Sequence, residues 1–384
     1  MVENLSVPTD RRVWQESLAL RDAGWDVTVV CPRGQDRDTE PHVVLEGIAI
    51  HRFPFRPAEG GPAGYGREYG SALLHMLRRA LTLGRFDVVQ VCSPPDLLFM
   101  AALPLRLRGA RIVFDQHDLS PELYLAKFAR GEDVVYKVLR LMERLTYRVS
   151  RVVISTNESY RRVALERGGC RPERVFVVRN APDPAVFREV PADPALRRGA
   201  AHLLTYVGMM GPQDGVDYAL RAIAHLRDRG RTDVHAVFVG AGDAQPAMVD
   251  LARELGLDGM VEFTGLVSHD EVARYISTAD VCLAPDPPGP FNDLSSMIKV
   301  VEYMAIGRPI VSFDLPESRI TAAGAALYAP DADEAAFADH VATLLDDPAL
   351  RAEMGRRGFE RFRDELSWDR STERLLAAYD SAVA

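Results

Sequence analysis

Short apolar runs rich in β-branched residues alternate with amphipathic stretches along nearly the whole chain. In the amphipathic stretches the apolar side chains recur every third or fourth position, which is typical of a helix that buries one face. The continuous apolar runs are typical of strands buried on both faces, as in parallel sheets covered by helices. The pattern therefore predicts an α/β fold.

The same pattern places the individual elements. In the first half, strands are expected at residues 26–32, 47–53, 87–93, 111–116, 151–156 and 174–180, and long helices at 11–23, 67–83 and 134–149. In the second half, strands are expected at residues 203–208, 234–240, 260–265, 281–285 and 309–314, followed by helices up to the C-terminus. A stretch rich in Pro, Asp and Ala at 181–201 separates the two series and indicates a domain boundary.

The length of the chain also favours two domains. Its 384 residues exceed the roughly 250 to 300 at which a single hydrophobic core stops growing. The domains are predicted to cover residues 1–185 and 186–366.

The first domain begins unusually, because only Met1 and Val2 stand where a buried first strand is normally found. Either this strand is very short or the start of the reading frame is set too late. The second interpretation is favoured, since losing most of a central strand removes burial and hydrogen bonds from the middle of a sheet.

Composition narrows the class of protein. No apolar run approaches the roughly 18 residues of a membrane-spanning helix, and the N-terminus lacks the features of a signal peptide, so a cytoplasmic location is expected. The four cysteines form no C-x-x-C pair and have no histidine at metal-ligand spacing beside them: Cys31, Cys92, Cys170 and Cys282. Neither a metal, a cofactor nor a nucleic-acid partner is predicted.

Charge is distributed unevenly along the chain. Residues 1–190 carry 28 Lys and Arg against 24 Asp and Glu, whereas the remaining residues carry 18 against 31. In the basic half, the helix at 134–149 has four basic side chains on one side: Lys137, Arg140, Arg144 and Arg148. Five apolar side chains are expected to form its opposite, buried face: Val138, Leu141, Met142, Leu145 and Val149. The basic side is interpreted either as the solvated face of a core helix or as a peripheral membrane contact.

Loops that follow strands are the candidate sites, because parallel sheets bind ligands at the carboxyl ends of their strands. The first such loop ends in Asp10, Arg11 and Arg12 before a helix, whose N-terminus attracts anions. These residues are candidates for the acceptor or phosphate side of a site. A helix cap formed by Thr9 or Asp10 is an equal alternative.

Two further residues in the first half are candidate catalytic groups. His117 and Asp118 directly follow the strand expected at 111–116. An imidazole beside a carboxyl group can contact a sugar hydroxyl or move a proton near neutral pH.

In the second half, glycines follow three successive strands. Gly208, Gly211 and Gly240 are candidates to let backbone N–H groups approach a diphosphate. Gly265 and Leu266 are candidates to offer backbone groups to a nucleobase.

The segment 292–309 is the most informative part of the sequence. Lys299, one of only three lysines in the chain, stands three residues before Glu302 on a predicted helix, so both share one face. They are interpreted either as a surface ion pair or as a site in which Glu302 binds ribose and Lys299 neutralises phosphate. Three neighbouring side chains are further candidates for donor binding: Asp293, Ser295 and Ser296.

Several of these segments resemble retaining glycosyltransferase family 4, of the group that uses nucleotide sugars. The resemblance runs along nearly the whole chain and includes His117-Asp118. Residues 180–183 (Asn-Ala-Pro-Asp) resemble the family's Asn-Gly-Val-Asp at the crossover between domains. Residues 302–309 resemble its Glu-Ala-Met-Ala-x-Gly-x-Pro, and Ser367-Trp368 resembles the start of its terminal helix.

The resemblance implies a GT-B fold, in which two Rossmann-like domains face each other across a cleft and a C-terminal helix, here 367–384, returns to the first domain. It implies that the second domain binds a nucleotide-diphosphate sugar and the first domain an acceptor. Transfer would be retaining and need no metal. Glu302 would hold the ribose, and His117 would lie near the donor sugar. The acceptor would be a glycan, a lipid-linked molecule or a small molecule, for example in cell-envelope polysaccharide synthesis.

The chain also departs from the family pattern. Where the family has an Arg and a Lys against the diphosphate, this chain has Met209-Met210 and Gln213-Asp214. We expect Lys299 to replace them, helped by backbone N–H groups around Ser295 and Ser296 and by Arg12. The missing cations leave one alternative from another class, a catalytically degenerate protein that binds a nucleotide or a partner as a regulatory subunit. A sugar-nucleotide epimerase of the same fold is a third, less favoured interpretation.

Overall fold

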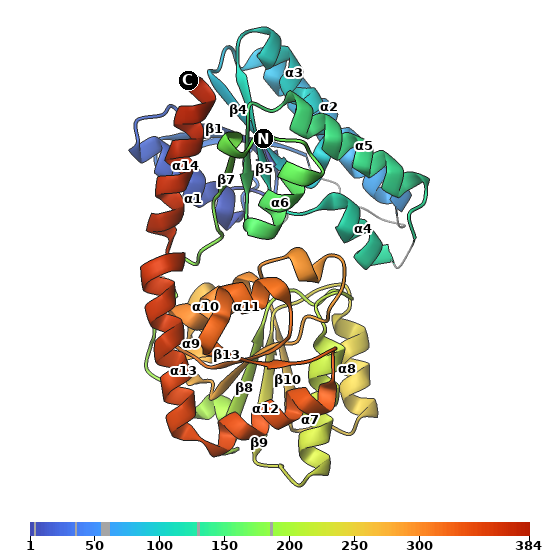
Figure 1. The fold of residues 1–384 in the computed structure, drawn as a ribbon, viewed down its shortest axis with the longest axis vertical. Coiled ribbons are helices and arrows are strands. Elements are labelled where there is room, and N and C mark those ends of the chain that lie inside the picture. The colour runs from blue at the N-terminus through green and yellow to red at the C-terminus, as the bar shows by residue number, and fades with distance from the viewer. Residues whose placement is uncertain (4, 35–36, 55–61, 129–130, 185–186) are drawn as a thin grey trace. The chain divides into compact units, whose positions relative to one another are not determined.

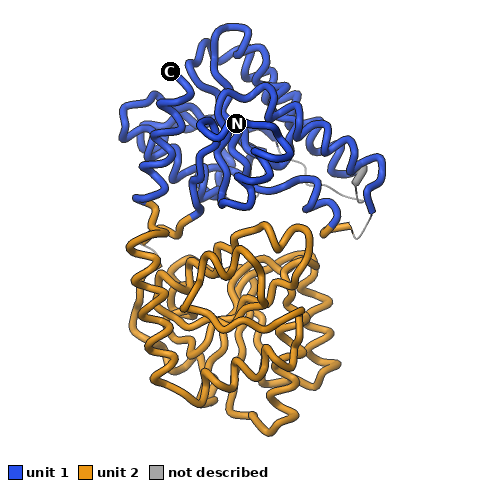
Figure 2. The backbone as a smooth tube through the Cα atoms, in the orientation of Figure 1, with its two compact units in different colours: residues 1–125, 130–180, 369–384 blue, residues 126–129, 181–368 orange. Residues whose placement is uncertain are grey.

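The structure is a computed structural model that describes residues 1–3, 5–34, 37–54, 62–128, 131–184 and 187–384. The chain divides into two compact units (Figure 2). Unit 1 contains Met1–Leu125, Arg130–Asn180 and Asp369–Ala384, and unit 2 contains Ala126–Ala129 and Ala181–Trp368. The chain thus leaves unit 1 after Asn180, whereas the boundary predicted at 185–186 lies outside the described residues.

Unit 1 contains two sheets (Figure 1). The first has the order β1 (Thr28–Pro32), β3 (Ile48–Phe53), β2 (His42–Leu45), with β1 and β3 parallel and β2 antiparallel. The second is parallel, in the order β4 (Val88–Ser93), β5 (Arg111–Gln116), β6 (Val152–Ser155), β7 (Val175–Val177). The strand β2 was not predicted from the sequence.

The first two residues connect these sheets. The amide of Val2 donates to the carbonyl of Val30 in β1 at 3.1 Å, and the amide of Cys92 in β4 donates to the carbonyl of Met1 at 3.1 Å. The amino group of Met1 also donates to the carbonyl of Gln90 at 2.8 Å. Residues 1 and 2 therefore stand between β1 and β4, at the position of the predicted very short strand.

The helices of unit 1 cover both faces of its sheets. They are α1 (Arg11–Asp22), α2 (Pro62–Thr82), α3 (Phe99–Leu107), α4 (Ser120–Phe128), α5 (Val134–Val149), α6 (Glu158–Glu166) and α14 (Trp368–Val383). Met76 of α2, Ala101 of α3 and Tyr147 of α5 belong to the same apolar core, whereas Val13 of α1 belongs to a different one. The helices α2, α3 and α5 therefore cover one face, and α1 covers the other.

Unit 2 is a Rossmann-like domain built on one parallel six-stranded sheet. Its order is β10 (Val261–Gly265), β9 (Val234–Val239), β8 (His202–Val207), β11 (Val281–Ala284), β12 (Ile310–Phe313), β13 (Ala326–Ala329). The helices are α7 (Val216–Asp228), α8 (Gln245–Glu254), α9 (His269–Thr278), α10 (Ile298–Ala305), α11 (Pro316–Ala322), α12 (Glu334–Asp346) and α13 (Pro348–Arg361). One core lies under α7 and α12 and another under α9 and α10, so helices cover both faces (Figure 1).

The structure confirms the predicted α/β class and the return of the C-terminal helix to the first unit. Tyr379 of α14 donates through its hydroxyl to the side-chain oxygen of Gln90 in β4 at 2.8 Å. Ser371 of α14 donates to the carbonyl of Arg179 at 2.9 Å. These contacts hold the last helix on residues that precede it by 192 and 289 positions.

One prediction about the helix at 134–149 is wrong. The side chains of α5 that are buried are polar or aromatic: Tyr136, Glu143, Thr146 and Tyr147. Val138 and Leu141, which were expected in the core, are about half exposed. The helix turns polar groups inward because a buried polar network lies beneath it, in which Thr146 donates to the carbonyl of Asp96 and Glu143 pairs with Arg167.

Candidate functional site

Three glycines of unit 2 lie side by side at the carboxyl edge of its sheet. Gly208, Gly240 and Gly265 end or directly follow β8, β9 and β10, which are neighbouring strands. Gly240 has a φ of +129°, and a Cβ atom there would lie 1.9 Å from the carbonyl oxygen of Gly208. Only glycine fits this close approach of two backbones.

The amide groups of these glycines have hydrogen-bond partners within unit 2. Gly208 donates its N–H to the carbonyl of Val239, and Gly240 donates to the carbonyl of Gly265. Gly211 donates to the Asp214 carboxylate at 2.7 Å. These three amides are therefore occupied, and the glycines serve close packing of the loops. The approach of other N–H groups of these turns to a diphosphate stays a prediction.

Lys299 lies beside this glycine edge. Its ammonium nitrogen is 2.7 Å from Oδ1 of Asp286 and 4.8 Å from the ring centre of Tyr206. A Cβ atom on Gly208 would lie 3.4 Å from Cε of Lys299. Lys299 comes from the first turn of α10, and Asp286 follows β11, so both stand where the strands end.

The Lys299–Asp286 pair is buried, with side-chain exposures of 7% and 2%. The interpretation of Lys299 and Glu302 as a surface ion pair is therefore wrong, since both residues are buried and Lys299 pairs with Asp286 instead. Oδ2 of Asp286 is buried and has no hydrogen-bond partner among the described residues. A buried pair with a free acceptor atom is typical of a site that completes its hydrogen bonds with a ligand.

Helix α10 adds further groups to this edge. Its N-cap residue Met297 provides no side-chain hydrogen bond, so the amides of the first turn are not capped by that residue. The first amides of an α-helix have no carbonyl four residues earlier within the helix, and they carry a partial positive charge. Of these amides in α10, that of Val300 donates to the carbonyl of Met297 at 3.1 Å. Glu302 is buried one turn further along the same helix. Cationic groups and a buried carboxylate thus come from one short helix.

The other donor-site candidates have structural contacts in the loop before α10. Asp293 accepts a hydrogen bond from the amide of Gly289, and Ser295 donates its hydroxyl to the carbonyl of Phe291. The hydroxyl of Ser296 donates to Glu317 at 3.3 Å. These residues shape the loop that leads to Lys299. Leu266 lies on the surface with 79% of its side chain exposed.

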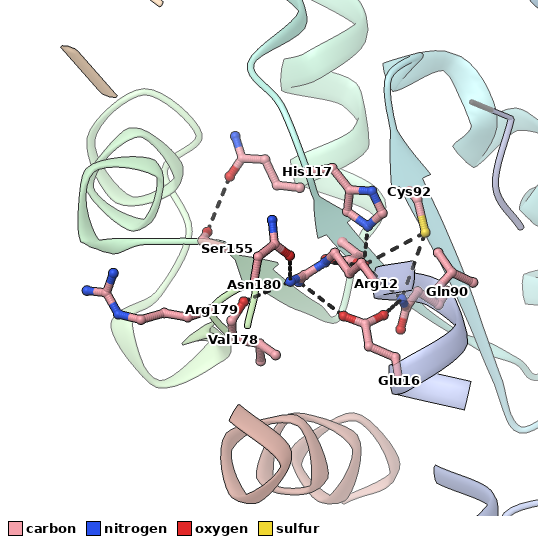
Figure 3. Close-up of polar contacts among 12 residues, drawn as sticks. Arg12, Glu16, Gln90, Cys92, His117, Ser155, Val178, Arg179 and Asn180 are labelled. Carbon is pink, nitrogen blue, oxygen red and sulfur yellow. Dashed lines mark hydrogen bonds and ion pairs between the residues drawn. The ribbon is translucent and has the colours of Figure 1, made fainter. Parts of the chain in front are cut away.

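In unit 1, Arg12 is the centre of a buried polar network (Figure 3). Its guanidinium donates to both carboxylate oxygens of Asp115, at 3.3 and 2.7 Å, and to the side-chain oxygen of Asn180 at 2.8 Å. It also donates to the carbonyl of Val178 and lies 3.1 Å from Glu16. The prediction that Arg12 binds a phosphate is therefore wrong, because these partners occupy its donors.

His117 belongs to the same network. Its Nε2 atom is 2.6 Å from Oδ2 of Asp115. Burial opposes the charge on Asp115, but the Arg12 guanidinium and the His117 ring outweigh it and hold the pKa of this carboxyl well below its usual range. Burial likewise opposes the charge on His117, but Asp115 outweighs it and raises the pKa of the imidazole well above its usual value. The Asp115 carboxylate thus favours the protonated form of the His117 ring and fixes the orientation of the ring.

One group of described residues has the composition of a metal site. Cys92, Asp115 and His117 place one ligand atom each within 4.8 Å of one another. The Arg12 guanidinium already lies on Asp115, and its positive charge opposes a metal cation there. These contacts favour the interpretation of the group as part of the Arg12 network.

The remaining candidates of unit 1 flank this network. Asp10 accepts a hydrogen bond from the amide of Val13 at 3.1 Å and so caps α1, as the alternative interpretation proposed. Arg11 is exposed at the start of the same helix. Asp118 is half-buried beside His117, and burial raises the pKa of its carboxyl.

Sequence reasoning missed two residues of these sites. Asp286 follows the strand β11, so its position at a carboxyl end was a usable signal. Asp115 lies within β5 and meets Arg12 from a distance of 103 residues along the chain. Nothing in the local sequence pattern predicts such a pairing.

Both halves of the chain match known sequence families. Residues 9–181 match the family described as "Glycosyl transferase 4-like domain". Residues 201–347 match the family described as "Glycosyl transferases group 1".

Individual relatives agree with these matches. The chain is 32% identical to alpha-D-kanosaminyltransferase of Streptomyces kanamyceticus over 391 residues, which cover 96% of this chain and 97% of that protein. It is 27% identical to glycogen synthase of Mycobacterium tuberculosis, with 93% and 87% covered. A match to D-inositol 3-phosphate glycosyltransferase of Kineococcus radiotolerans, at 29% identity, covers 60% of this chain and only 57% of that protein.

Solved structures share the fold. Sucrose-phosphate synthase of Thermosynechococcus elongatus superimposes with a TM-score of 0.78 at 18% identity, over 99% of this chain and 98% of that one. The Anabaena protein HepE, solved in complex with UDP, superimposes with a TM-score of 0.72 at 15% identity over the same shares of the two chains. At these identities the likeness concerns the GT-B fold alone.

Proposed function

Because the chain belongs to glycosyltransferase family 4, we propose that it transfers a sugar from a nucleoside diphosphate donor to an acceptor hydroxyl with retention of the anomeric configuration. The observation that carries the proposal is the edge of the unit 2 sheet, where a buried lysine, the N-terminus of helix α10 and a buried carboxylate come from neighbouring positions of the chain. Phosphate, ribose and a developing negative charge need these groups.

The donor is assigned to unit 2. Lys299 and the first amides of α10 stabilise the diphosphate, and Glu302 accepts hydrogen bonds from the ribose hydroxyls. The free oxygen of Asp286 accepts a further donor hydroxyl. The loop after β10, with Gly265 and Leu266, offers backbone groups and an exposed apolar side chain to the base.

The acceptor is assigned to unit 1, with His117 near the reacting sugar. Asp115 fixes the ring through Nε2, so the imidazolium stabilises negative charge and does not act as a base. Front-face attack then transfers the acceptor's proton to the departing diphosphate while the C–O bond to the sugar breaks and the new one forms. Catalysis rests on positioning and on stabilising the leaving group, without a metal or another cofactor.

The acceptor class completes the proposal. We assign a glycan, lipid-linked or small-molecule acceptor, as in cell-envelope polysaccharide synthesis. Among the described residues, no helix combines the length and hydropathy that crossing a bilayer requires. A lipid-linked acceptor would bring this cytoplasmic enzyme to the inner face of the membrane, with the helix at 134–149 as the contact.

The non-catalytic alternative receives no support. The relatives reported above are named for sugar transfer or polysaccharide synthesis, and the missing family cations have a local replacement in Lys299. No observation favours a regulatory subunit or an epimerase.

Thermal unfolding in the presence of nucleotides tests the donor assignment. UDP, GDP, ADP and dTDP are compared, and one of them is expected to stabilise the protein by about 2.7 kcal/mol at a concentration of 100 times its dissociation constant. The matching nucleotide sugar should then yield a product whose anomeric configuration, measured by NMR, is that of the donor. An inverted product would contradict retention, and no stabilisation by any nucleotide would contradict the donor site.

A further inference from the structure

Helix α5 carries its apolar side chains outward. Val134 is 76% exposed, Val138 50% and Leu141 51%. These three residues are spaced by four and three positions, so they form one stripe along the helix. Exposed aliphatic residues at single positions are ordinary, but a stripe of them is typical of an interaction surface.

Basic side chains flank this stripe. Lys137, Arg144 and Arg148 are exposed on α5 and lie on the side adjacent to the apolar stripe. Arg140, which was grouped with them from the sequence, instead donates to the hydroxyl of Tyr136. The one carboxylate of α5, Glu143, is buried and pairs with Arg167. The outer side of α5 is therefore apolar and purely cationic.

The neighbouring helices extend the surface. α2 and α3 cover the same face of unit 1 as α5 (Figure 1). Half of the large apolar side chains that are exposed in the described part of the chain lie on these three helices: Leu74, Leu81, Met100, Leu107, Val134, Val135, Val138 and Leu141. Exposed arginines accompany them on α2 and α3: Arg67, Arg78 and Arg106. We call this set of exposed residues on α2, α3 and α5 the docking face.

The charge of the docking face decides between two occupants. A second copy of the chain, joined by a two-fold axis, would place the same patch on both sides of the interface and bring basic residues near basic residues. An anionic lipid surface is complementary to the cations, and its acyl boundary accepts the aliphatic side chains. Charge complementarity therefore favours the bilayer.

We infer that the outer surface of α2, α3 and α5, centred on Val134, Val138, Leu141 and the three cations of α5, docks unit 1 on an anionic membrane surface. The inference identifies the membrane as the partner of unit 1, which is proposed to bind the acceptor. It rests on the proposed function, because membrane docking would serve to deliver a lipid-borne acceptor. The binding itself requires no turnover.

Sedimentation of the full chain with vesicles tests the inference. Vesicles of phosphatidylcholine with phosphatidylglycerol are compared with vesicles of phosphatidylcholine alone. We expect binding to the anionic vesicles only, weakened by added salt because exposed charges are screened. The double variant Val138→Asp/Leu141→Asp and the triple variant Lys137→Glu/Arg144→Glu/Arg148→Glu should each reduce the partition coefficient at least about tenfold.

Control measurements distinguish a loss of membrane binding from misfolding and from a loss of catalysis. Val44→Asp changes an aliphatic residue of unit 1 that is 59% exposed on β2, away from the docking face, and should bind vesicles like the unaltered protein. All variants should unfold at similar temperatures, because the substituted side chains are exposed. Turnover of the variants with a water-soluble acceptor should equal that of the unaltered protein. The turnover assay thus reports a loss of sugar transfer, and sedimentation reports a loss of docking.

Three results would overturn the inference. The first is that the unaltered protein does not bind anionic vesicles. The second is that the variants bind these vesicles as strongly as the unaltered protein. The third is that sedimentation velocity shows a dimer that the same substitutions dissociate. The last result would assign the docking face to a second copy of the chain.

Discussion

At the scale of single residues, the Lys299–Asp286 pair constrains how the donor site can be tested. Removing Lys299 alone leaves a buried carboxylate without its cation, which typically costs about 3–5 kcal/mol of stability. A loss of activity in that variant could therefore result from misfolding as well as from a slower chemical step. Removing both charges together avoids this loss of stability, because two neutral groups of similar shape need no counter-charge.

We predict that the double variant Lys299→Met/Asp286→Asn keeps a melting temperature near that of the unaltered protein but loses about 10- to 100-fold in kcat, because a cation no longer stabilises the leaving diphosphate. Calorimetry checks the melting temperature, and steady-state kinetics with the identified donor checks kcat. Arg253→Met, which replaces an exposed cation on α8 of unit 2, serves as the control. An unchanged kcat in the double variant would remove Lys299 from the reaction.

A second prediction concerns Asp96, which is buried in unit 1 with an unpartnered Oδ2 atom. Burial, and then the neighbouring carboxylate of Glu143, raise its pKa from 3.8 to about 8, although Arg167 lowers it. The folded protein thus keeps a proton that the unfolded chain releases between these two pH values. Stability contributed by this proton is complete below pH 3.8 and is lost as the pH rises to about 8.

Replacing Asp96 with Asn should reduce this loss, since the amide does not ionise. Urea unfolding is measured between pH 5 and pH 8, where each unit of pKa displacement corresponds to about 1.4 kcal/mol, so the variant should gain stability on the order of a few kcal/mol at the alkaline end. Asp87→Asn, which changes an exposed carboxylate of the same unit, should leave the pH dependence as it is. Equal slopes for the Asp96 variant and the unaltered protein would show that Asp96 is ionised in the folded state.

The contacts of single residues are also the features that the sequence predicts least well. Its position after a strand identified His117 as a candidate, and its rarity and its place three residues before Glu302 on a predicted helix identified Lys299, because these features are visible in the sequence. Their partners Asp115 and Asp286 were not identified. A buried ion pair depends on which distant segments the fold brings together, and Arg12 shows the consequence, since an arginine at a helix start was given a ligand role that its partners exclude.

At the scale of elements, the apolar pattern predicted most strands of the three sheets, because buried parallel strands are continuous apolar runs. It missed β2, whose residues alternate between exposed and half-buried, and β13, whose sequence Ala-Leu-Tyr-Ala lacks β-branched residues. It also assigned the wrong buried face to α5. The periodicity of apolar residues predicts that a helix has an apolar and a polar face. In α5 the polar face is the buried one, because it contacts the polar network beneath the helix.

The C-terminal helix allows a prediction at this scale. Leu375 of α14 is fully buried, and replacing it with Ala should lower the free energy of unfolding by about 2–5 kcal/mol through lost burial and a residual cavity. Glu373→Ala, two residues earlier on the exposed side of the same helix, should change it by less than about 0.5 kcal/mol. Chemical denaturation of both variants checks this, and equal stabilities would mean that α14 does not pack as described.

At the scale of the whole molecule, each unit contributes a different kind of site. Unit 1 offers a histidine fixed by a buried carboxylate and a cationic, apolar docking face. Unit 2 offers a buried lysine and the N-terminus of helix α10 at its sheet edge. Apart from the short segment Ala126–Ala129, the chain passes into unit 2 after Asn180 and returns to unit 1 after Trp368, where α14 packs. The division of charge along the sequence, basic first and acidic later, agrees with the docking face on unit 1 but does not predict its location.

Calorimetric titration of the stabilising nucleoside diphosphate into the unaltered protein and into Glu302→Gln tests the central claim most directly. The account predicts one binding site per chain and a dissociation constant that rises at least about tenfold in the variant, because a charge-assisted hydrogen bond to the ribose is worth about 1.5–3 kcal/mol. The exposed residue Glu254, changed to Gln, should bind as the unaltered protein does. Equal affinities for the Glu302 variant and the unaltered protein would contradict the claim that the edge of the unit 2 sheet holds the donor.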